Sequence, residues 1–151
     1  MKFDDALSAL GRQMNVAALA FNDAGVCRMV FDRELVVDCE RVAGSDEAAW
    51  LYAVVASLPA EREAVLMRLL EANLFGAETG DASLAIDSVM SEILLQQKVD
   101  TAAMDDTAFA AAVERFVHVL EYWREELAAM PSGGAADGLS HALPGEGMMR
   151  V

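Results

Sequence analysis

The sequence is poor in the residues on which enzymes and metal sites depend. It has two cysteines and two histidines, and neither Cys27 nor Cys39 has a Cys or His neighbour at zinc-ligand spacing. Nothing near His118 or His141 indicates a Ser–His–Asp arrangement. The segment GAETGDAS lacks the lysine that would follow the second glycine of a phosphate-binding loop. We therefore expect no catalytic residue, no metal ligand and no cofactor.

Basic residues are also scarce. Eleven Lys and Arg stand against 25 Asp and Glu, which gives a net charge of -14. Such a chain repels nucleic acid and anionic membranes, so neither is an expected partner. The acids explain solubility as well as they explain attraction of a basic partner. The pairs Asp4–Asp5 and Asp105–Asp106 favour helix starts over Mg or Ca ligands.

No apolar run is long enough to span a bilayer, since the longest is Ala48–Leu58. The N-terminus, MKFDDALSAL, does not resemble a signal peptide. Hydrophobic content is nevertheless 55%, which reflects either an alanine-rich composition or surplus apolar surface for an oligomer or a partner. Cys27 and Cys39 occupy apolar positions and are expected to be buried free thiols, as in a reducing cytosol.

The chain is organised around residues 62–99. A helix over Ala60–Phe75 is broken by Gly76 and Gly80, and a second hairpin follows over Ser83–Val99, with its turn at 87–91. Spacing predicts that Arg62, Glu63, Arg68 and Glu71 face water. The expected apolar side of this helix comprises Val65, Leu66, Leu69, Leu70, Asn73 and Leu74.

Before this stretch, the pattern predicts a helix over residues 2–14, with Phe3, Ala6, Leu7, Leu10 and Met14 on one stripe. A weak strand is expected at 16–21, then a turn at 22–25. Alternating segments at 26–32 and 35–41 predict an antiparallel hairpin. Trp50–Leu58 is apolar on both faces, which indicates a central strand or one covered by another subunit, although a helix is an alternative.

After the second hairpin, Asp105 or Asp106 is expected to cap a long helix that ends near Ala129. Tyr122 and Trp123 flank its stripe, which is apolar except for Arg124. Residues 131–151 are rich in Gly and Pro without periodicity and are expected to be a disordered tail. The sequence thus predicts one α+β domain over residues 1–130. The stripe comprises Phe109, Ala112, Val113, Phe116, Val117, Leu120, Arg124 and Leu127.

The order helix, strands, helix, hairpin, helix resembles class I type III secretion chaperones, the Tir-chaperone family. Four segments carry the resemblance. GVCRMVFD is similar to the family's early strand, WLYAVVASLP to its third strand, and AFAAAVERFVHVLEYWREEL to its closing helix. LLEANLFGAETGDASLAID is similar to its most recognisable segment, where a Leu-Leu-x-x-Asn-Leu run meets glycines and a strand that ends in Asp. The match covers residues 1–129, and the tail departs from the family core.

The resemblance implies a homodimeric, cytoplasmic bacterial chaperone that is not an enzyme. It would bind the N-terminal segment of a secreted effector in extended form and keep it competent for export. The export ATPase of the secretion system is a further partner that the resemblance suggests. By resemblance, the dimer interface should draw on the 60–75 helix and the second hairpin, with Leu66, Leu70, Leu84, Ile86, Ile93 and Leu95 as candidates.

The expected effector site combines the first helix and the first hairpin. The helix carries more apolar bulk than one short helix usually needs, and the hairpin would otherwise expose valines to water. The alternative for the helix is that its side chains close the core. The candidate residues are Phe3, Leu7, Leu10, Val26, Arg28, Val30 and Val36.

Two other functions stay open from the sequence. One is a regulatory or binding protein outside secretion on the same fold, because a fold does not determine a function. The other is a small acidic metal-dependent enzyme.

Overall fold

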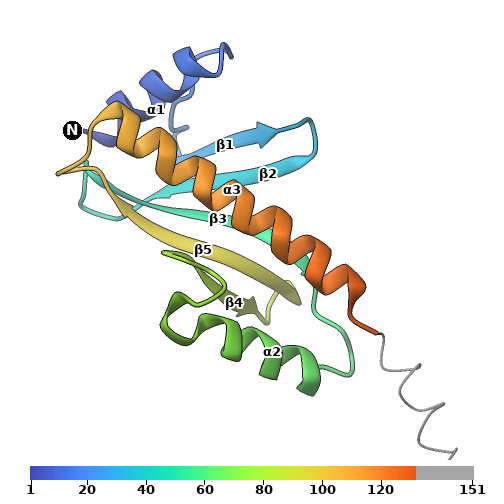
Figure 1. The fold of residues 1–151 in the computed structure, drawn as a ribbon. Coiled ribbons are helices and arrows are strands. Elements are labelled where there is room, and N and C mark those ends of the chain that lie inside the picture. Colours follow the sequence, from blue (N-terminus) through green and yellow to red (C-terminus); the bar gives the residue numbers. More distant parts are fainter. Residues whose placement is uncertain (132–151) are drawn as a thin grey trace, which may run out of the picture.

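Five antiparallel strands form a single twisted sheet in the order β1-β2-β3-β5-β4 in this computed structural model, which describes residues 1–131. Figure 1 shows α3 crossing one face of this sheet. We call this face the inner face and the opposite one the outer face. The strands are β1 (Val26–Phe31), β2 (Leu35–Arg41), β3 (Ala48–Ser57), β4 (Ser83–Asp87) and β5 (Glu92–Asp100).

The helices are placed around this sheet at three positions. α3 (Asp106–Ala129) spans the inner face, and α1 (Phe3–Gln13) packs beside the first half of α3. α2 (Glu63–Asn73) lies along β4 at the far end and continues into the short turn η1 (Leu74–Gly76). No helix within residues 1–131 is long and apolar enough to cross a membrane.

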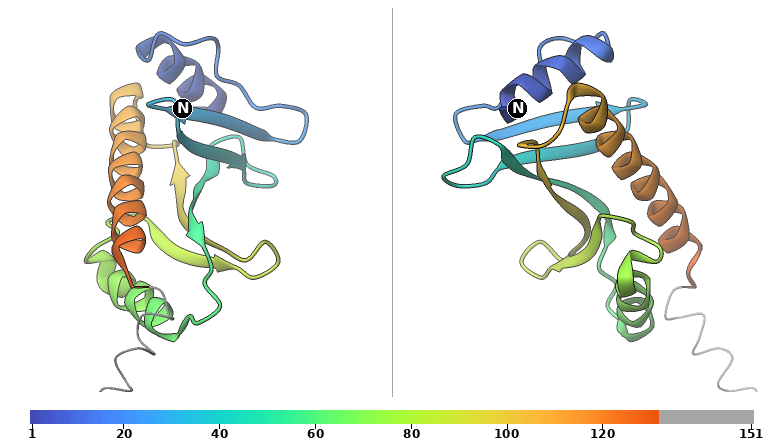
Figure 2. Two further views of the ribbon diagram at one scale, coloured as in Figure 1. Left: turned by 90° about the vertical axis from the view of Figure 1, so that its right-hand side faces the viewer. Right: turned by 60° about the vertical axis from the view of Figure 1, so that its left-hand side comes forward.

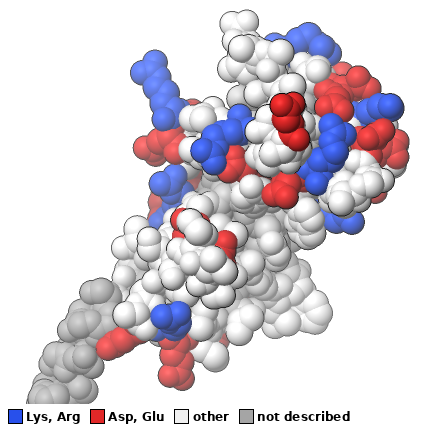
Figure 3. All heavy atoms as spheres, turned by 180° about the vertical axis from the view of Figure 1, so that it is seen from behind, with Lys and Arg blue, Asp and Glu red and all other residues white. Residues whose placement is uncertain are grey.

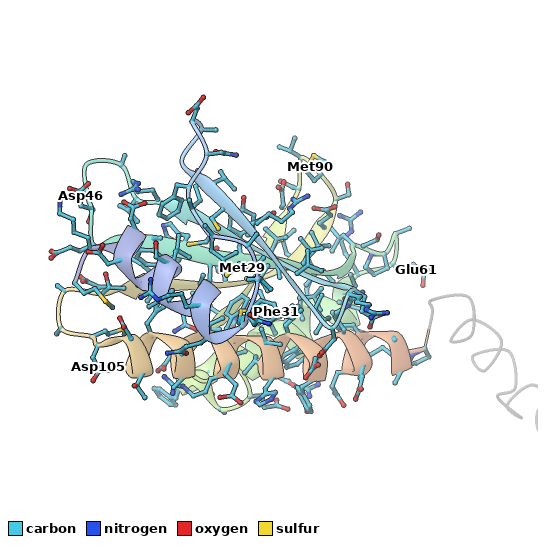
Figure 4. The ribbon with its side chains drawn as sticks, turned by 90° about the horizontal axis from the view of Figure 1, so that it is seen from above. Met29, Phe31, Asp46, Glu61, Met90 and Asp105 are labelled. Carbon is cyan, nitrogen blue, oxygen red and sulfur yellow. The ribbon has the colours of Figure 1, made fainter. Side chains whose placement is uncertain are left out.

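The core lies between the sheet and α3. Alternate residues of each strand point inward, as the period of a strand requires. In Figure 4, seen from above, Phe31 lies between the sheet and α3, whereas Met90 lies on the other side of the sheet. Trp123, Phe109 and Phe116 of α3 are at most 1% exposed, and Phe109 meets the Phe3 ring of α1 edge-on at 5.2 Å.

Most predicted elements are confirmed. The hairpin of β1 and β2 forms in register, with Cys27 opposite Cys39. The segment 48–57 is a strand with neighbours on both sides, so the alternative of a helix is wrong. Asp105 caps α3, since its Oδ1 accepts a hydrogen bond of 2.7 Å from the Ala108 amide. The predicted tail, residues 131–151, lies outside the described residues except for residue 131.

The weak strand expected at 16–21 is wrong. This segment crosses α1, where the Leu19 amide nitrogen lies 3.3 Å from the position a Cβ on Gly11 would take. Phe21 then packs against Phe3, and the Arg41 guanidinium lies 4.3 Å from its ring centroid. Leu19 and Phe21 of this segment pack against the core, whereas its other residues are exposed, and the segment pairs with no strand of the described residues.

The prediction for the second helix is wrong in its bounds and its faces. α2 runs from Glu63 to Asn73, shorter than expected at both ends, and Phe75 adopts a left-handed φ of 55°. Only Leu69 and Ala72 of α2 are buried. The expected apolar side is therefore divided between the core and solvent. Arg68, expected to face water, is a half-buried anchor described below.

Candidate binding surfaces

The outer face of the sheet carries apolar side chains that nothing within residues 1–131 covers. Four of them are between 39% and 49% exposed, which is more than a closed sheet face would show. Seen from behind, charged side chains gather over the upper part of the molecule, and below them lies a largely uncharged area with a few more charged side chains at its lower edge (Figure 3). The four residues are Val30, Val36, Trp50 and Val54.

The candidate effector residues divide between core and surface. Phe3, Leu7 and Leu10 are at most 5% exposed, so the apolar bulk of α1 closes the core and is not a free surface in this structure. That part of the expected site is corrected. On the hairpin, Val26 is half-buried, whereas Arg28, Val30 and Val36 are exposed. Val30 stands directly opposite Val36 across the two strands.

Arg28 is positioned by its strand partner. Its Nε and Nη2 donate to the two carboxylate oxygens of Asp38, both at 2.7 Å, and Asp38 lies directly opposite in β2. This pair raises the pKa of Arg28, mainly through the hydrogen bonds to Asp38. Because the guanidinium is planar and held at both ends, it forms a flat polar patch beside Val30 and Val36.

β1 also leaves a free backbone edge. The Arg41 amide donates to the Gly25 carbonyl, and hydrogen-bonded pairs recur at every second residue of an antiparallel ladder. The backbone groups of Val26, Arg28 and Val30 therefore point away from β2. Those of Val26 bond to Asn22, at 2.9 Å through the carbonyl and 3.0 Å through the amide. Arg28 and Val30 have no such partner among the described residues.

A second apolar surface follows the outer side of α2 and η1. Of the candidate dimer residues, Leu70 and Ile86 are exposed and Leu66 is half-buried, whereas Leu84, Ile93 and Leu95 are buried within the subunit. Sequence reasoning missed Phe75, which is 98% exposed in a backbone conformation that bulky residues rarely adopt. We call this surface the α2 patch; its exposed members are Met67, Leu70, Leu74 and Phe75.

Polar contacts fix α2 to the rest of the molecule. The Arg68 guanidinium donates to the Glu78 carboxylate, with one bond of 2.7 Å, and to Glu126 of α3 at 3.1 Å. It also lies 4.8 Å from the ring centroid of Trp123, whose indole N–H donates to the Glu78 carbonyl at 2.9 Å. Hydrogen bonds from Arg68 hold the pKa of Glu78 below its ordinary value. This network sets how the α2 patch is presented.

Two further features of the described residues concern metal-binding side chains and reactive thiols. No set of three His, Cys, Asp or Glu residues there is arranged to hold a metal ion. Cys27 and Cys39 are free and buried, as predicted. Burial raises the pKa of both thiols, which disfavours the reactive thiolate. The surfaces described above are suited to binding.

The fold matches solved structures closely. It superposes on the structure of the HopA1-SchA chaperone-effector complex with a TM-score of 0.67 and 17% identity, covering 82% of this chain and 93% of that one. It superposes on the ExsC-ExsE complex with a TM-score of 0.67 and 17% identity, covering 82% of this chain and 91% of that one. A third match is the Yersinia pestis type III secretion chaperone SycH in complex with a stable fragment of YscM2. Its TM-score is 0.64 at 16% identity, and the match covers 80% of this chain and 98% of that one.

The sequence itself gives the assignment. A comparison with curated protein sequences found no match. The model of the Tir chaperone protein (CesT) family, however, matches residues 5–124, which include every helix and strand except the two residues of α1 before Asp5 and the end of α3. This chain therefore belongs to the Tir chaperone protein (CesT) family.

Proposed function

We propose that this chain is a type III secretion chaperone that binds the N-terminal segment of a secreted effector in extended form. It would keep the effector stable and competent for export in the bacterial cytoplasm. The observation that carries this proposal is the uncovered outer face of β1 and β2 in a member of the Tir chaperone family. The regulatory protein and the metal-dependent enzyme have no comparable observation in their favour.

The geometry of β1 supports an extended partner. The unpaired backbone groups of Arg28 and Val30 can accept a further strand, which is a common mode of peptide recognition. The adjacent valines supply apolar contacts for alternate side chains of that strand. The net charge of -14 favours effector segments that carry basic residues.

The proposal includes a homodimer through the α2 patch. Leu70 and Phe75 are 68% and 98% exposed, and a second copy would remove both from water. Removing these apolar side chains from water favours association, and the freedom lost by the two copies on binding offsets part of that gain. The export ATPase of the secretion system stays a prediction drawn from the family.

A capture experiment with matched variants tests the proposed effector surface. Tagged wild-type chain, expressed in its native host, should retain a protein that the host secretes, and deletion of the chain should lower secretion of that protein. Val30→Asp places a charge on the exposed face of β1 and should abolish retention while the chain stays folded. Val16→Asp is the control, since Val16 is 46% exposed against 49% for Val30 and lies outside the sheet. Equal retention by both variants would contradict the proposed surface.

A further inference from the structure

The sheet is split between β2 and β3. Their ladder begins at Arg41 with Ala49 and ends at Asp38 with Tyr52, although β2 extends back to Leu35 and β3 continues to Ser57. Figure 1 shows the two strands diverging beyond this point, with α3 crossing in front of the sheet, on its inner face. The β1–β2 hairpin and the β3–β5–β4 part of the sheet thus separate at one end.

Both walls of the split carry unpaired strand backbone. The Val42 amide donates to the Ala48 carbonyl, so the pairs 40/50 and 38/52 are also hydrogen-bonded, and 36/54 would be the next. That pair does not form. Val36 pairs with Val30 on its other side, and Val54 pairs with Leu94. The amide and carbonyl of Val36 and Val54 therefore point into the split without a partner among residues 1–131.

The opening is a groove rather than a narrow gap. It has a volume of about 390 Å³ and passes from Val36 and Tyr52 on the outer face to Arg124 of α3 on the inner side. Val36 and Val54 form its apolar rims and are 39% and 47% exposed. An extended chain needs unpaired backbone on its flanks and apolar contacts for alternate side chains, and this groove offers both.

Negative charge at one end of the groove favours extended chains that carry a basic side chain. A second hollow of about 450 Å³ shares Glu34 and Arg124 with the groove and adds Asp32, Glu121 and Glu125. Four carboxylates stand there against one guanidinium. Arg124 is the only charged member of the α3 stripe, and it forms no ion pair among the described residues. The excess negative charge complements a basic side chain.

We propose that the split between β2 and β3 is a second binding groove, which takes an extended segment of the client protein. The segment pairs its backbone with Val36 and Val54, places an apolar side chain between these two valines, and directs a basic side chain to the carboxylates around Arg124. This inference rests on the proposed function, because it assigns a second contact to the same client.

Hydrogen exchange tests the free groove without any variant. The amides of Val36 and Val54 should exchange rapidly in the wild-type protein, because they have no partner. The amides of Val37 and Ala53 point to β1 and β5 and should be protected. Slow exchange at both Val36 and Val54 in the free chain would overturn the proposal.

A peptide probe tests the occupant. The probe is a short fluorescein-labelled peptide in which valine alternates with lysine and threonine, and its binding is followed by anisotropy. It should bind and should protect the Val36 and Val54 amides. Replacing its lysines with glutamates, or methylating the amides of its valines, should weaken binding about tenfold or more. No binding, or binding that neither change affects, would overturn the proposal.

Variants separate this groove from the outer surface of β1. Val54→Asp should weaken the probe about tenfold, whereas Val16→Asp, at 46% exposure against 47%, should not. One outcome is that Val30→Asp loses client retention while Val54→Asp keeps both client retention and probe binding. That outcome would support the proposed function and overturn the groove. The reverse pattern would support the groove and remove the β1 surface. If Val54→Asp does not fold, Val54→Thr replaces it, with a smaller loss expected.

Discussion

Asn73 pairs with Leu84 as a neighbouring strand would. Its Nδ2 donates to the Leu84 carbonyl at 2.9 Å, and its Oδ1 accepts from the Leu84 amide at 2.8 Å. β4 is an edge strand with β5 as its only strand neighbour, so these two backbone groups would otherwise be unpaired. One amide side chain thus joins the end of α2 to the sheet and closes the middle of an edge.

Replacing Asn73 with Ala should lower the free energy of unfolding by about 1–3 kcal/mol, because two partly buried backbone groups lose their partners. Urea denaturation measures this loss. Gln13→Ala, at an exposed position at the end of α1, is the control and should cost far less. A loss no larger than that of Gln13→Ala would mean that water replaces the amide at β4 without penalty.

The Arg68 network predicts a pH-dependent loss of stability. Arg68→Met removes the hydrogen bonds to Glu78 and Glu126 and should lower the melting temperature at neutral pH more than Arg62→Met does. The folded-state pKa of Glu78 lies below its ordinary value of 4.5, so its contribution is complete above that value. It is lost as the pH falls through the lower folded pKa.

The difference between wild type and Arg68→Met should therefore shrink as the pH is lowered below 4.5. Thermal unfolding of both proteins across this range checks it. A difference that stays constant from neutral to acid pH would show that Glu78 does not carry the effect, and would point to the contact with Trp123.

The α2 patch predicts a dimer that charge can dissociate. Leu70→Asp combined with Phe75→Asp should give a folded monomer, because the charges would have to be buried in the interface. Sedimentation equilibrium at micromolar concentration measures the mass, with Val16→Asp as the control that stays dimeric. A wild-type protein that is monomeric under these conditions rules out the dimer.

The corrected role of α1 is tested at Leu7. This side chain is fully buried, so Leu7→Ala should cost about 2–5 kcal/mol of unfolding free energy, while Val30→Ala on the exposed face should cost little. Denaturant titration distinguishes the two. Unchanged stability in Leu7→Ala would restore α1 as a candidate effector surface.

A chain that ends at Met130 should fold as well as the full chain. The sequence beyond it lacks the apolar periodicity that would offset an ordering cost of about 1–2 kcal/mol per residue. Calorimetry of the two chains should give the same melting temperature and enthalpy. A fall of several degrees on truncation would show that the tail contributes to the folded domain.

Period and turn chemistry were sufficient to predict most of the fold. Alternation placed Cys27 and Met29 inside, and the acids at 105 and 106 located the start of α3. The same rules failed at 16–21, because a segment that covers a helix is as apolar as a strand. They also failed at Trp123, expected beside the stripe of α3, which is fully buried because Glu78 and Arg68 cover its indole.

The binding surfaces were harder to predict than the fold. The sequence pattern does not show whether an apolar residue on a helix packs in the core, as Leu7 does, or is exposed to solvent, as Leu70 is. Only the position of α2 at the end of the sheet decides between them. The split between β2 and β3 leaves no mark in the sequence, because alternation gives the faces of a strand but not where its pairing ends.

The two tryptophans make the molecule its own optical reporter. Trp50 lies on the outer face of β3, opposite Glu40 and Lys98, and is 40% exposed, whereas Trp123 is inaccessible. A soluble quencher in the free protein therefore reaches one indole and spares the other. A ligand seated on the outer face of β3 would shield Trp50 and leave the emission of Trp123 as an internal standard. Occupancy and folding can thus be monitored in one unlabelled sample.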